Sequence, residues 1–513
     1  YRRFFDINAL GAIRMEDPTV FREAHSLIFR LIREGKVTGV RLDHVDGLFD
    51  PSSYLYRLQK GCFIQIGLAA AGGGDAEAEA LLAKGYDEAA AAEPLFKPFY
   101  VVGEKILFKD ERLPGSWPVF GTTGYDFLNA LNGIFIDTEN VRAFDRVYAR
   151  FVRGAVNFPE AVYEGKKLVM QVAMSGEVNT LGHYLNTISE RDRLTRDFTL
   201  NSLTRAITEV IACFPVYRTY TNSSEVRDDD ARQIEAAVAK AKRRNPAISA
   251  SVFDFLRNVL LLRLPGHATD GNKMEWLNFV MRFQQITGPV MAKGVEDTAF
   301  YLYNRLVSLN EVGGAPNRFG TSLDAFHGQN LERLKTCPHA LITSATHDSK
   351  RGEDTRARIN ALSEIPGKWQ KALAAWSQLN RRKKRMVDGQ PVPGRNEEYL
   401  LYQTLIGAWP AAAPDESAHE LFRARIGEYM VKAAREAKVN SSWINPNAAY
   451  EEALSAFIDV ILSDHGFLKK FRPLQDMIAR CAVFTSLSQV LLKMASPGVP
   501  DFYQGTELWD LSL

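Results

Sequence analysis

Cysteine is scarce in this sequence, and neither sign of charge is in large excess. The four cysteines are widely separated and form no CxxC pair: Cys62, Cys213, Cys337 and Cys481. This spacing argues against a disulfide framework or a structural zinc site, and it favours a reducing, cytoplasmic location. The 63 Lys and Arg against 61 Asp and Glu leave a formal net charge of +2. Electrostatics therefore gives no reason to expect nucleic acid or an anionic membrane as partner.

Long hydrophobic runs and an initiating methionine are missing as well. No uninterrupted apolar run approaches the roughly 18 residues of a membrane span, and the chain begins with Tyr1. Hydrophobic residues make up 46% and charged residues 24% of the 513 positions, a composition typical of a globular protein with ample core. The length predicts two to four domains or one large barrel with insertions. The first residue suggests a piece of a longer protein.

The pattern along the chain indicates helices followed by buried strands, which is the αβ unit of a parallel sheet. Asp17 caps a predicted helix over residues 17–34, whose apolar residues recur at helical spacing. Predicted strands cover residues 37–45, 99–107, 340–346 and 498–503, with a weaker one at 119–127. Residues 131–335 and 361–480 are mostly helical in pattern, and the Ala- and Gly-rich residues 66–93 indicate a surface insertion.

Three of these strands end in ionisable residues. The segments GVRLDHVDGL (39–48), VVGEKIL (101–107) and ATHDSKRGED (345–354) place Asp43, Glu104 and Asp348 at strand ends. In a parallel α/β barrel such ends converge on one face, although a single carboxylate there is more often an ordinary salt bridge. Two convergent carboxyls can break a glycosidic bond, one as nucleophile and one as acid.

The neighbours of these carboxylates fit the two roles. Arg41 shares a strand face with Asp43, since residues two apart point the same way, and its charge favours the ionised nucleophile. Glu104 lies in a more apolar strand, which favours the protonated acid. Lys105 is expected on the opposite side of that strand from Glu104.

These motifs resemble those of the α-amylase superfamily, glycoside hydrolase family 13. The resemblance implies Asp43 as nucleophile, Glu104 as acid/base and Asp348 as transition-state stabiliser, with Arg41 and His347 contacting the sugar ring. It also implies an α/β fold, a (β/α)8 TIM barrel of the α-amylase type with large helical insertions. The barrel is expected to be incomplete here, because the family's Asp-x-x-x-x-Asn-His motif and the first three strands have no counterpart in the sequence.

Within that superfamily the sequence is most similar to the maltooligosyl trehalose synthase family. The similarity rests on YRRFFDINALGAIRMEDP (1–18), MAKGVEDTAFYLYNRLVSLNEVGG (291–314), THDSKRGEDTRARI (346–359) and GVPDFYQGTEL (498–508). It implies an isomerase that converts the reducing-end α-1,4 bond of a maltooligosaccharide into an α,α-1,1 bond. A hydrolase that releases trehalose would be the pathway partner, without a necessary physical contact. No metal, cofactor, nucleic acid or membrane is expected.

Such a reaction frees the reducing-end glucose and then joins it again through the new bond. The enzyme therefore has to hold the freed glucose in a closed pocket and exclude water. The candidate donors are His44, Lys293 and Lys350, although a lysine is as easily a surface residue. The adjacent Glu296 and Asp297 are expected to have a structural role, because neighbouring residues on a strand diverge.

The predicted organisation has five parts: barrel strands four to six in residues 1–130, a helical insertion at 131–340, strand seven at 341–360, a helical subdomain at 361–480, and the last barrel helix and strand at 481–513. The C-terminal β domain is expected to be absent. Two alternatives stay open. One is a hydrolytic enzyme of the α-amylase type, and the other is a non-catalytic glucan-binding fragment.

Overall fold

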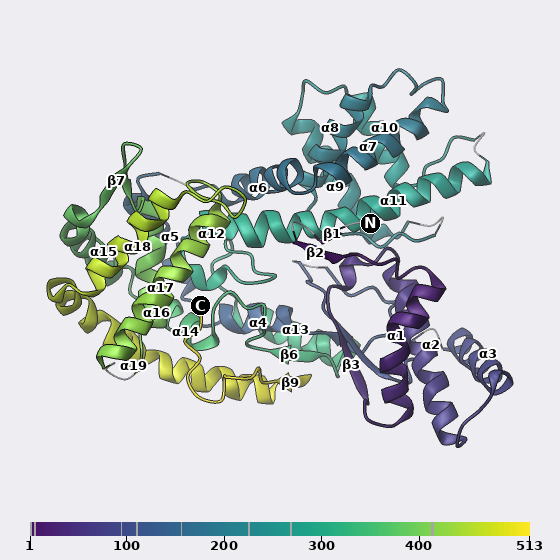
Figure 1. The fold of residues 1–513 in the computed structure, drawn as a ribbon, viewed down its shortest axis with the longest axis horizontal. Coiled ribbons are helices and arrows are strands. Elements are labelled where there is room, and N and C mark those ends of the chain that lie inside the picture. Colours follow the sequence, from purple (N-terminus) through teal and green to yellow (C-terminus); the bar gives the residue numbers. More distant parts are fainter. Residues whose placement is uncertain are drawn as a thin grey trace. The chain divides into compact units, whose positions relative to one another are not determined.

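The computed structural model describes residues 3–4, 7–93, 95–108, 111–154, 156–223, 226–266, 269–411 and 415–513. The chain forms two compact units, which are described separately (Figure 1). Unit 1 comprises Tyr1–Thr123 and Tyr163–Gly294, and unit 2 comprises Gly124–Val162 and Val295–Leu513. These limits do not coincide with the five parts drawn from the sequence, which remain a prediction.

A short parallel sheet organises the first part of unit 1. Its strand order is β3-β4-β5, with bounds Gly39–Leu42, Tyr100–Gly103 and Gly121–Thr122. The central β4 is almost entirely buried, whereas the edge strand β3 is half-buried with Arg41 exposed. The expectation that residues 37–45 form a buried strand is therefore wrong for β3. Its side that faces away from β4 has no strand partner among the described residues.

The helices around this sheet follow the sequence pattern closely. The carboxylate of Asp17 accepts the Thr19 N–H at 2.8 Å and so caps α1, Pro18–Arg33. The Ala- and Gly-rich segment is almost wholly helical, because α2, Pro51–Ala70, runs into it and α3, Ala76–Ala92, fills the rest. A small antiparallel pair precedes α1, made of β1, Arg3–Phe4, and β2, Ile7–Gly11.

A helical bundle forms the remainder of unit 1. Its hydrophobic core is built from residues between Tyr163 and Val290. The helices are α7 Ser175–Glu190, α8 Leu200–Cys213, α9 Asp228–Arg244, α10 Ala250–Leu260 and α11 Asp270–Met291, and α6 Phe158–Val172 leads into them. The long helical tract predicted for this region is confirmed.

The bundle contains a buried lysine whose charge opposes folding. Lys166 is 2% exposed, and its amino group donates to the Phe214 carbonyl at 2.8 Å. Burial lowers the pKa of Lys166 to about 7, and the charge of Lys240 adds to this effect. The folded state thus binds this proton more weakly than the unfolded chain does. Above about pH 10.5 Lys166 is neutral in both states and costs no stability. As the pH falls from there towards 7, the unfolded chain takes up the proton first, so the free energy of unfolding decreases.

Replacement of this lysine by methionine should remove that pH dependence. We expect Lys166→Met to melt above the wild type near pH 7, with a gap that narrows steadily as the pH approaches 10.5. The melting temperature, recorded between pH 6 and 10.5, measures the gap. Lys84→Met is the control, since the Lys84 side chain is 75% exposed and should change little. A gap that is constant with pH would contradict the charged-lysine explanation.

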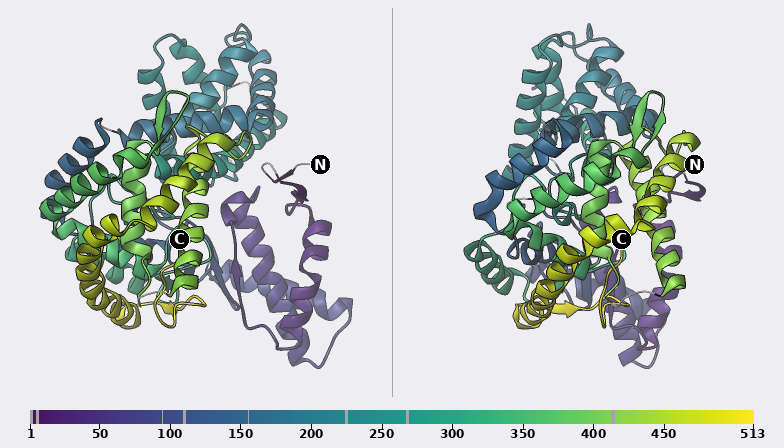
Figure 2. Two further views of the ribbon diagram at one scale, coloured as in Figure 1. Left: turned by 60° about the vertical axis from the view of Figure 1, so that its left-hand side comes forward. Right: turned by 90° about the vertical axis from the view of Figure 1, so that its left-hand side faces the viewer.

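Unit 2 has its own parallel strand pair beneath a layer of helices. The strands are β6, Leu341–Thr343, and β9, Val499–Asp501, paired in parallel. The helices, blue for α5 and green to yellow for the others in Figure 2, include α5 Val141–Val152, α13 Leu323–Thr336, α14 Glu353–Asn360, α15 Pro366–Asn380, α16 Arg395–Ala408, α17 Glu416–Ala437, α18 Ala448–Leu462 and α19 His465–Ala495. A hairpin of β7, Arg385–Val387, and β8, Gln390–Val392, lies between α15 and α16.

The weak strand expected at residues 119–127 is only partly present. After the two residues of β5 the chain turns at Gly124, with φ of 95°, into α4, Tyr125–Gly133. A Cβ at Gly124 would lie 2.7 Å from the Leu341 carbonyl oxygen. Glycine therefore allows both the left-handed turn and the close approach of this helix start to β6.

Among the described residues the parallel strands form sheets of three and two, so a closed (β/α)8 barrel remains a prediction. The helix α19 is longer than expected, and it is long and apolar enough to cross a membrane by length and composition alone. Only 22% of its most apolar window is buried, and Phe484, Leu487 and Leu491 are exposed on it.

Candidate functional site

The first predicted pair of site residues lies at the carboxyl end of β3. The guanidinium of Arg41 lies 2.9 Å from the Asp43 carboxylate, Nη1 to Oδ1, so the expected contact between these residues is confirmed. The Asp43 side chain is 60% exposed. An accessible carboxylate beside a fixed positive charge is suited to attack an electrophilic carbon.

The parallel register of β3 and β4 carries Glu104 to the same edge of the sheet. Leu42 pairs with Gly103, and the Glu104 N–H donates to the Leu42 carbonyl at 2.7 Å. The Glu104 carboxylate in turn accepts the backbone N–H of His44 at 2.9 Å. His44 adopts a left-handed conformation with φ of 48°, directly after Asp43. Thus Asp43 and Glu104 directly follow two adjacent parallel strands, and the Glu104 carboxylate is bonded to the backbone of the residue after Asp43.

A buried charge cluster lies directly beside these two carboxylates. Lys105 is 2% exposed, and its amino group is 2.8 Å from Glu111 and 3.5 Å from Asp46. The hydroxyl of Tyr220 donates to Asp46, and the guanidinium of Arg218 donates to the Asp46 carbonyl at 2.6 Å. The cluster therefore joins the end of β4, the turn that follows Asp43 and the helical bundle within unit 1.

The pKa values in this cluster reflect the balance of burial and pairing. Burial is the largest effect on Lys105 and lowers its pKa, but the carboxylates of Asp46 and Glu111 outweigh burial and raise the pKa overall. Burial raises the pKa of Glu111, against the opposing effect of Lys105. Burial also raises the pKa of Tyr220 well above its usual value, and Asp46 adds to this rise. Lys105 thus stays charged between its partners.

The His-Asp pair lies in unit 2, after β6. The Nε2 atom of His347 is 3.1 Å from Oδ2 of Asp348, and the two side chains are 48% and 55% exposed. The hydroxyl of Tyr125, itself buried in the core, is 2.9 Å from Oγ1 of Thr346 just before the pair. These contacts leave His347 and Asp348 at the exposed turn of the loop between β6 and α14.

The predicted donor lysines differ in their surroundings. The amino group of Lys350 is 2.7 Å from the Asp297 carboxylate, and the Lys350 side chain is only 16% exposed. Burial lowers the pKa of Lys350, but the carboxylates of Asp297 and Glu296 outweigh burial and raise it overall. Lys293 is half-buried in the π-helical segment Ala292–Ala299.

The expected strand at Glu296 and Asp297 is wrong, because both residues lie in the π-helical segment Ala292–Ala299, although both side chains do make structural contacts. Glu296 is 8% exposed and accepts the Gly313 N–H at 3.2 Å, while Asp297 pairs with Lys350. Sequence reasoning named Lys105 but missed its partners Asp46, Glu111 and Tyr220, and it also missed Glu311, whose buried side chain pairs with Arg356. The available signal was a charged residue inside an apolar motif, as in GEKIL and LNEVGG.

Comparisons with known proteins agree with the motif-based resemblance. No family model matches the chain. It is 31% identical over all 513 residues to the putative maltooligosyl trehalose synthase of two Mycobacterium tuberculosis strains, of which it covers 57%. The resemblance to maltooligosyl trehalose synthases is therefore confirmed over the full length of this chain.

Solved structures give the same result. The maltooligosyltrehalose synthase of Arthrobacter ramosus superposes with a TM-score of 0.79 at 33% identity, covering 99% of this chain and 56% of that protein. A Sulfolobus tokodaii hypothetical maltooligosyl trehalose synthase gives 0.74 at 31% identity, with coverages of 99% and 57%. The chain thus spans a little over half the length of the relatives that it matches.

Proposed function

We propose that this chain, which is similar along its whole length to maltooligosyl trehalose synthases, carries the catalytic residues of such an enzyme. The reaction would be an intramolecular transglucosylation that converts the reducing-end α-1,4 bond of a maltooligosaccharide into an α,α-1,1 bond. The observation that carries the proposal is the placement of the Arg41–Asp43 pair and Glu104 at the ends of adjacent parallel strands. The enzyme would be an isomerase, an intramolecular transferase, and a member of glycoside hydrolase family 13.

In the proposed first step Asp43 attacks the anomeric carbon and Glu104 protonates the departing glucose oxygen. The bond between this carbon and the glycosidic oxygen breaks as the carboxylate forms a covalent glycosyl ester. Arg41 stabilises the carboxylate before attack, since its guanidinium is already in contact with Asp43. Because the backbone of His44 fixes Glu104, the acid does not need to reorient for this transfer.

In the proposed second step the freed glucose turns over and reacts again. Glu104, now a carboxylate, removes the proton from the anomeric hydroxyl of glucose, and that oxygen attacks the intermediate. The ester to Asp43 breaks, and the α configuration is retained through two inversions. His44, Lys293 and Lys350 are the proposed donors that hold the glucose, while His347 and Asp348 are assigned to the sugar ring and its transition state.

Intact protein incubated with maltopentaose tests this proposal. Loss of reducing ends with an unchanged molecular mass supports the mutase, because rearrangement consumes the reducing end without adding water. Release of glucose or maltose as the main product would show the hydrolytic alternative instead. Binding of the sugar without any turnover would favour the non-catalytic glucan-binding protein. A cytoplasmic location and a trehalose-releasing hydrolase as pathway partner complete the proposal.

A further inference from the structure

The loop that carries His347 and Asp348 has little means of fixing these side chains through their own packing. Both are about half exposed, and the 3.1 Å contact between His347 and Asp348 joins these two side chains only to each other. Their position must therefore come from the backbone of residues 344–352, between β6 and α14. Two short contacts shape the turn itself: Thr346 N–H to Ser349 Oγ at 2.8 Å, and Asp348 N–H to Thr346 Oγ1 at 3.2 Å.

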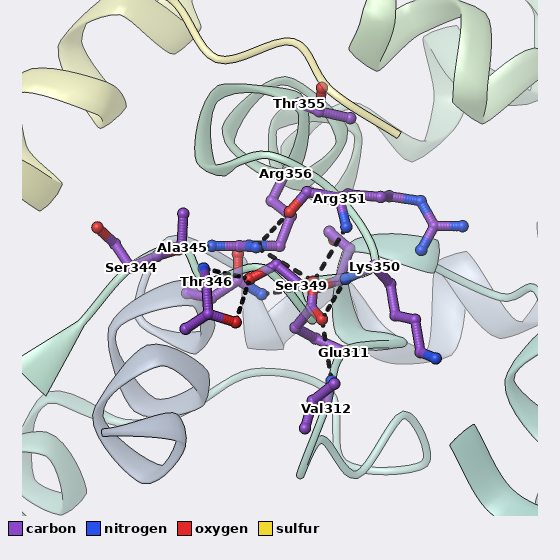
Figure 3. A network of polar contacts seen from close by, with 12 residues as sticks. Glu311, Val312, Ser344, Ala345, Thr346, Ser349, Lys350, Arg351, Thr355 and Arg356 are labelled. Atoms are coloured by element: carbon purple, nitrogen blue, oxygen red, sulfur yellow. Dashed lines mark hydrogen bonds and ion pairs between the residues drawn. The ribbon is translucent and has the colours of Figure 1, made fainter. Parts of the chain in front are cut away.

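One buried carboxylate, that of Glu311, holds the part of this loop that leads towards α14. Oε1 of Glu311 accepts the backbone N–H of Lys350 at 2.6 Å, and Oε2 accepts that of Arg351 at 3.3 Å (Figure 3). The Glu311 side chain is 1% exposed and also accepts the Val312 N–H at 3.0 Å. A carboxylate can accept all of these bonds at once because both of its oxygens are acceptors.

One buried guanidinium, that of Arg356, contacts the loop both where it leaves β6 and near its end. Arg356 donates to the Ser344 carbonyl at the end of β6 and to the Arg351 carbonyl at 2.6 Å. Its Nη1 atom is 3.1 Å from Oε2 of Glu311, and its side chain is 1% exposed. The single ion pair Glu311–Arg356 therefore contacts both sides of the loop. Removal of charge from either partner would leave the other buried and uncompensated.

We propose that Glu311, together with Arg356, is a positioning residue that sets the conformation of the loop presenting His347 and Asp348. The assignment rests on the proposed function, and it gives a role to the LNEVGG segment, for which the sequence indicated none. Glu311 does not touch the sugar in this scheme. It acts through the backbone N–H groups of Lys350 and Arg351, only two and three residues after Asp348.

The test compares Glu311→Gln with a matched buried pair elsewhere in unit 2. Glutamine keeps the shape, but its amide nitrogen would face a donor instead of accepting from it. The control is Glu398→Gln, because Glu398 is fully buried and paired with Lys384 at 2.8 Å. Amide hydrogen exchange of residues 344–356 and steady-state kinetics with maltopentaose are both measured well below the melting temperature of each variant.

We expect Glu311→Gln to increase exchange at Lys350 and Arg351, and to lower kcat about tenfold or more with a smaller change in KM, since charge-assisted hydrogen bonds are the strong ones. Glu398→Gln should leave both readouts at wild-type values. Protected amides and wild-type kcat in Glu311→Gln would overturn the proposal. Equal kcat losses in both variants would also overturn it, because they would indicate general destabilisation.

Two further outcomes keep the result decisive. If Glu311→Gln does not fold, Arg356→Lys decides, because lysine keeps the charge but cannot contact Ser344, Arg351 and Glu311 together. We then expect the same rise in exchange and a kcat loss in the same direction, and their absence would refute the inference. If wild-type protein does not turn over maltopentaose, the proposed function fails, while the exchange experiment still tests the loop contact by itself.

Discussion

Asp43→Asn should abolish turnover of maltopentaose, with a loss of about 10⁴-fold or more, the order expected when the nucleophile of covalent catalysis is removed. The amide cannot form the glycosyl ester, and the Arg41 guanidinium loses its charged partner. The fold should be nearly unaffected, because the Asp43 side chain is 60% exposed and exposed ion pairs contribute little. Initial rates of reducing-end loss, together with the melting temperature, measure the two effects.

A substrate whose leaving group needs no proton distinguishes the role of Asp43 as nucleophile from the role of Glu104 as acid. With a maltooligosyl fluoride, Glu104→Gln should still form the covalent intermediate on Asp43, whereas Asp43→Asn should not. Mass spectrometry of the intact protein detects this ester. Asp87→Asn is the matched control, because Asp87 is a half-exposed aspartate paired with Lys60 at 2.7 Å in the same unit. Wild-type rates in Asp43→Asn would show that another group is the nucleophile.

The local part of the candidate site could be predicted from the sequence. The contact of Arg41 with Asp43 follows from the two-residue period of a strand, and the capped start of α1 follows from Asp17 and Pro18. The place of Glu104 beside the β3 end required only that neighbouring strands run parallel. In each case the interacting groups are near in sequence or connected by a regular backbone pattern.

The strand bounds and the partners of the buried ions could not be predicted from the sequence in the same way. Val45 and Ile106 are buried but lie outside β3 and β4, so an apolar run extends further than the hydrogen-bonded ladder. The partners of the buried ions are distant in sequence, since Tyr220 follows Asp46 by 174 residues and Arg356 follows Glu311 by 45. Such contacts depend on the tertiary arrangement, and a single sequence does not contain a period that reveals them.

Lys105→Met should destabilise the protein by about 3–5 kcal/mol at neutral pH, which is the usual cost of removing one partner of a buried ion pair. Methionine fills the space of the lysine stem, but Asp46 and Glu111 are left buried without the cation that lies 3.5 and 2.8 Å from them. The turn after Asp43 should lose order with the cluster, so activity should fall as well. Denaturant unfolding monitored by circular dichroism measures the change.

The size of this effect depends on burial, which a matched variant tests. Lys60→Met removes a lysine with an equally close partner, Asp87 at 2.7 Å, but at a partly exposed site where the expected loss is at most about 1 kcal/mol. A triple variant of Lys105→Met with Asp46→Asn and Glu111→Gln should recover part of the lost stability, because neither neutral side chain then needs the Lys105 cation, whereas the buried Arg218 still loses the charge of Asp46.

The pH dependence provides a second check on the same explanation. Burial already raises the pKa of Glu111 when Lys105 is present, and without Lys105 the opposing attraction is gone. In the Lys105→Met variant, protonation of Glu111 should remove its uncompensated charge as the pH falls. The difference in free energy of unfolding between the variant and the wild type should therefore shrink below neutral pH. A deficit that stays constant from pH 8 to 5, or a triple variant no more stable than the single one, would assign the loss to packing. The agreement of both checks would instead establish Lys105 as the charge that holds the turn after Asp43 to the end of β4.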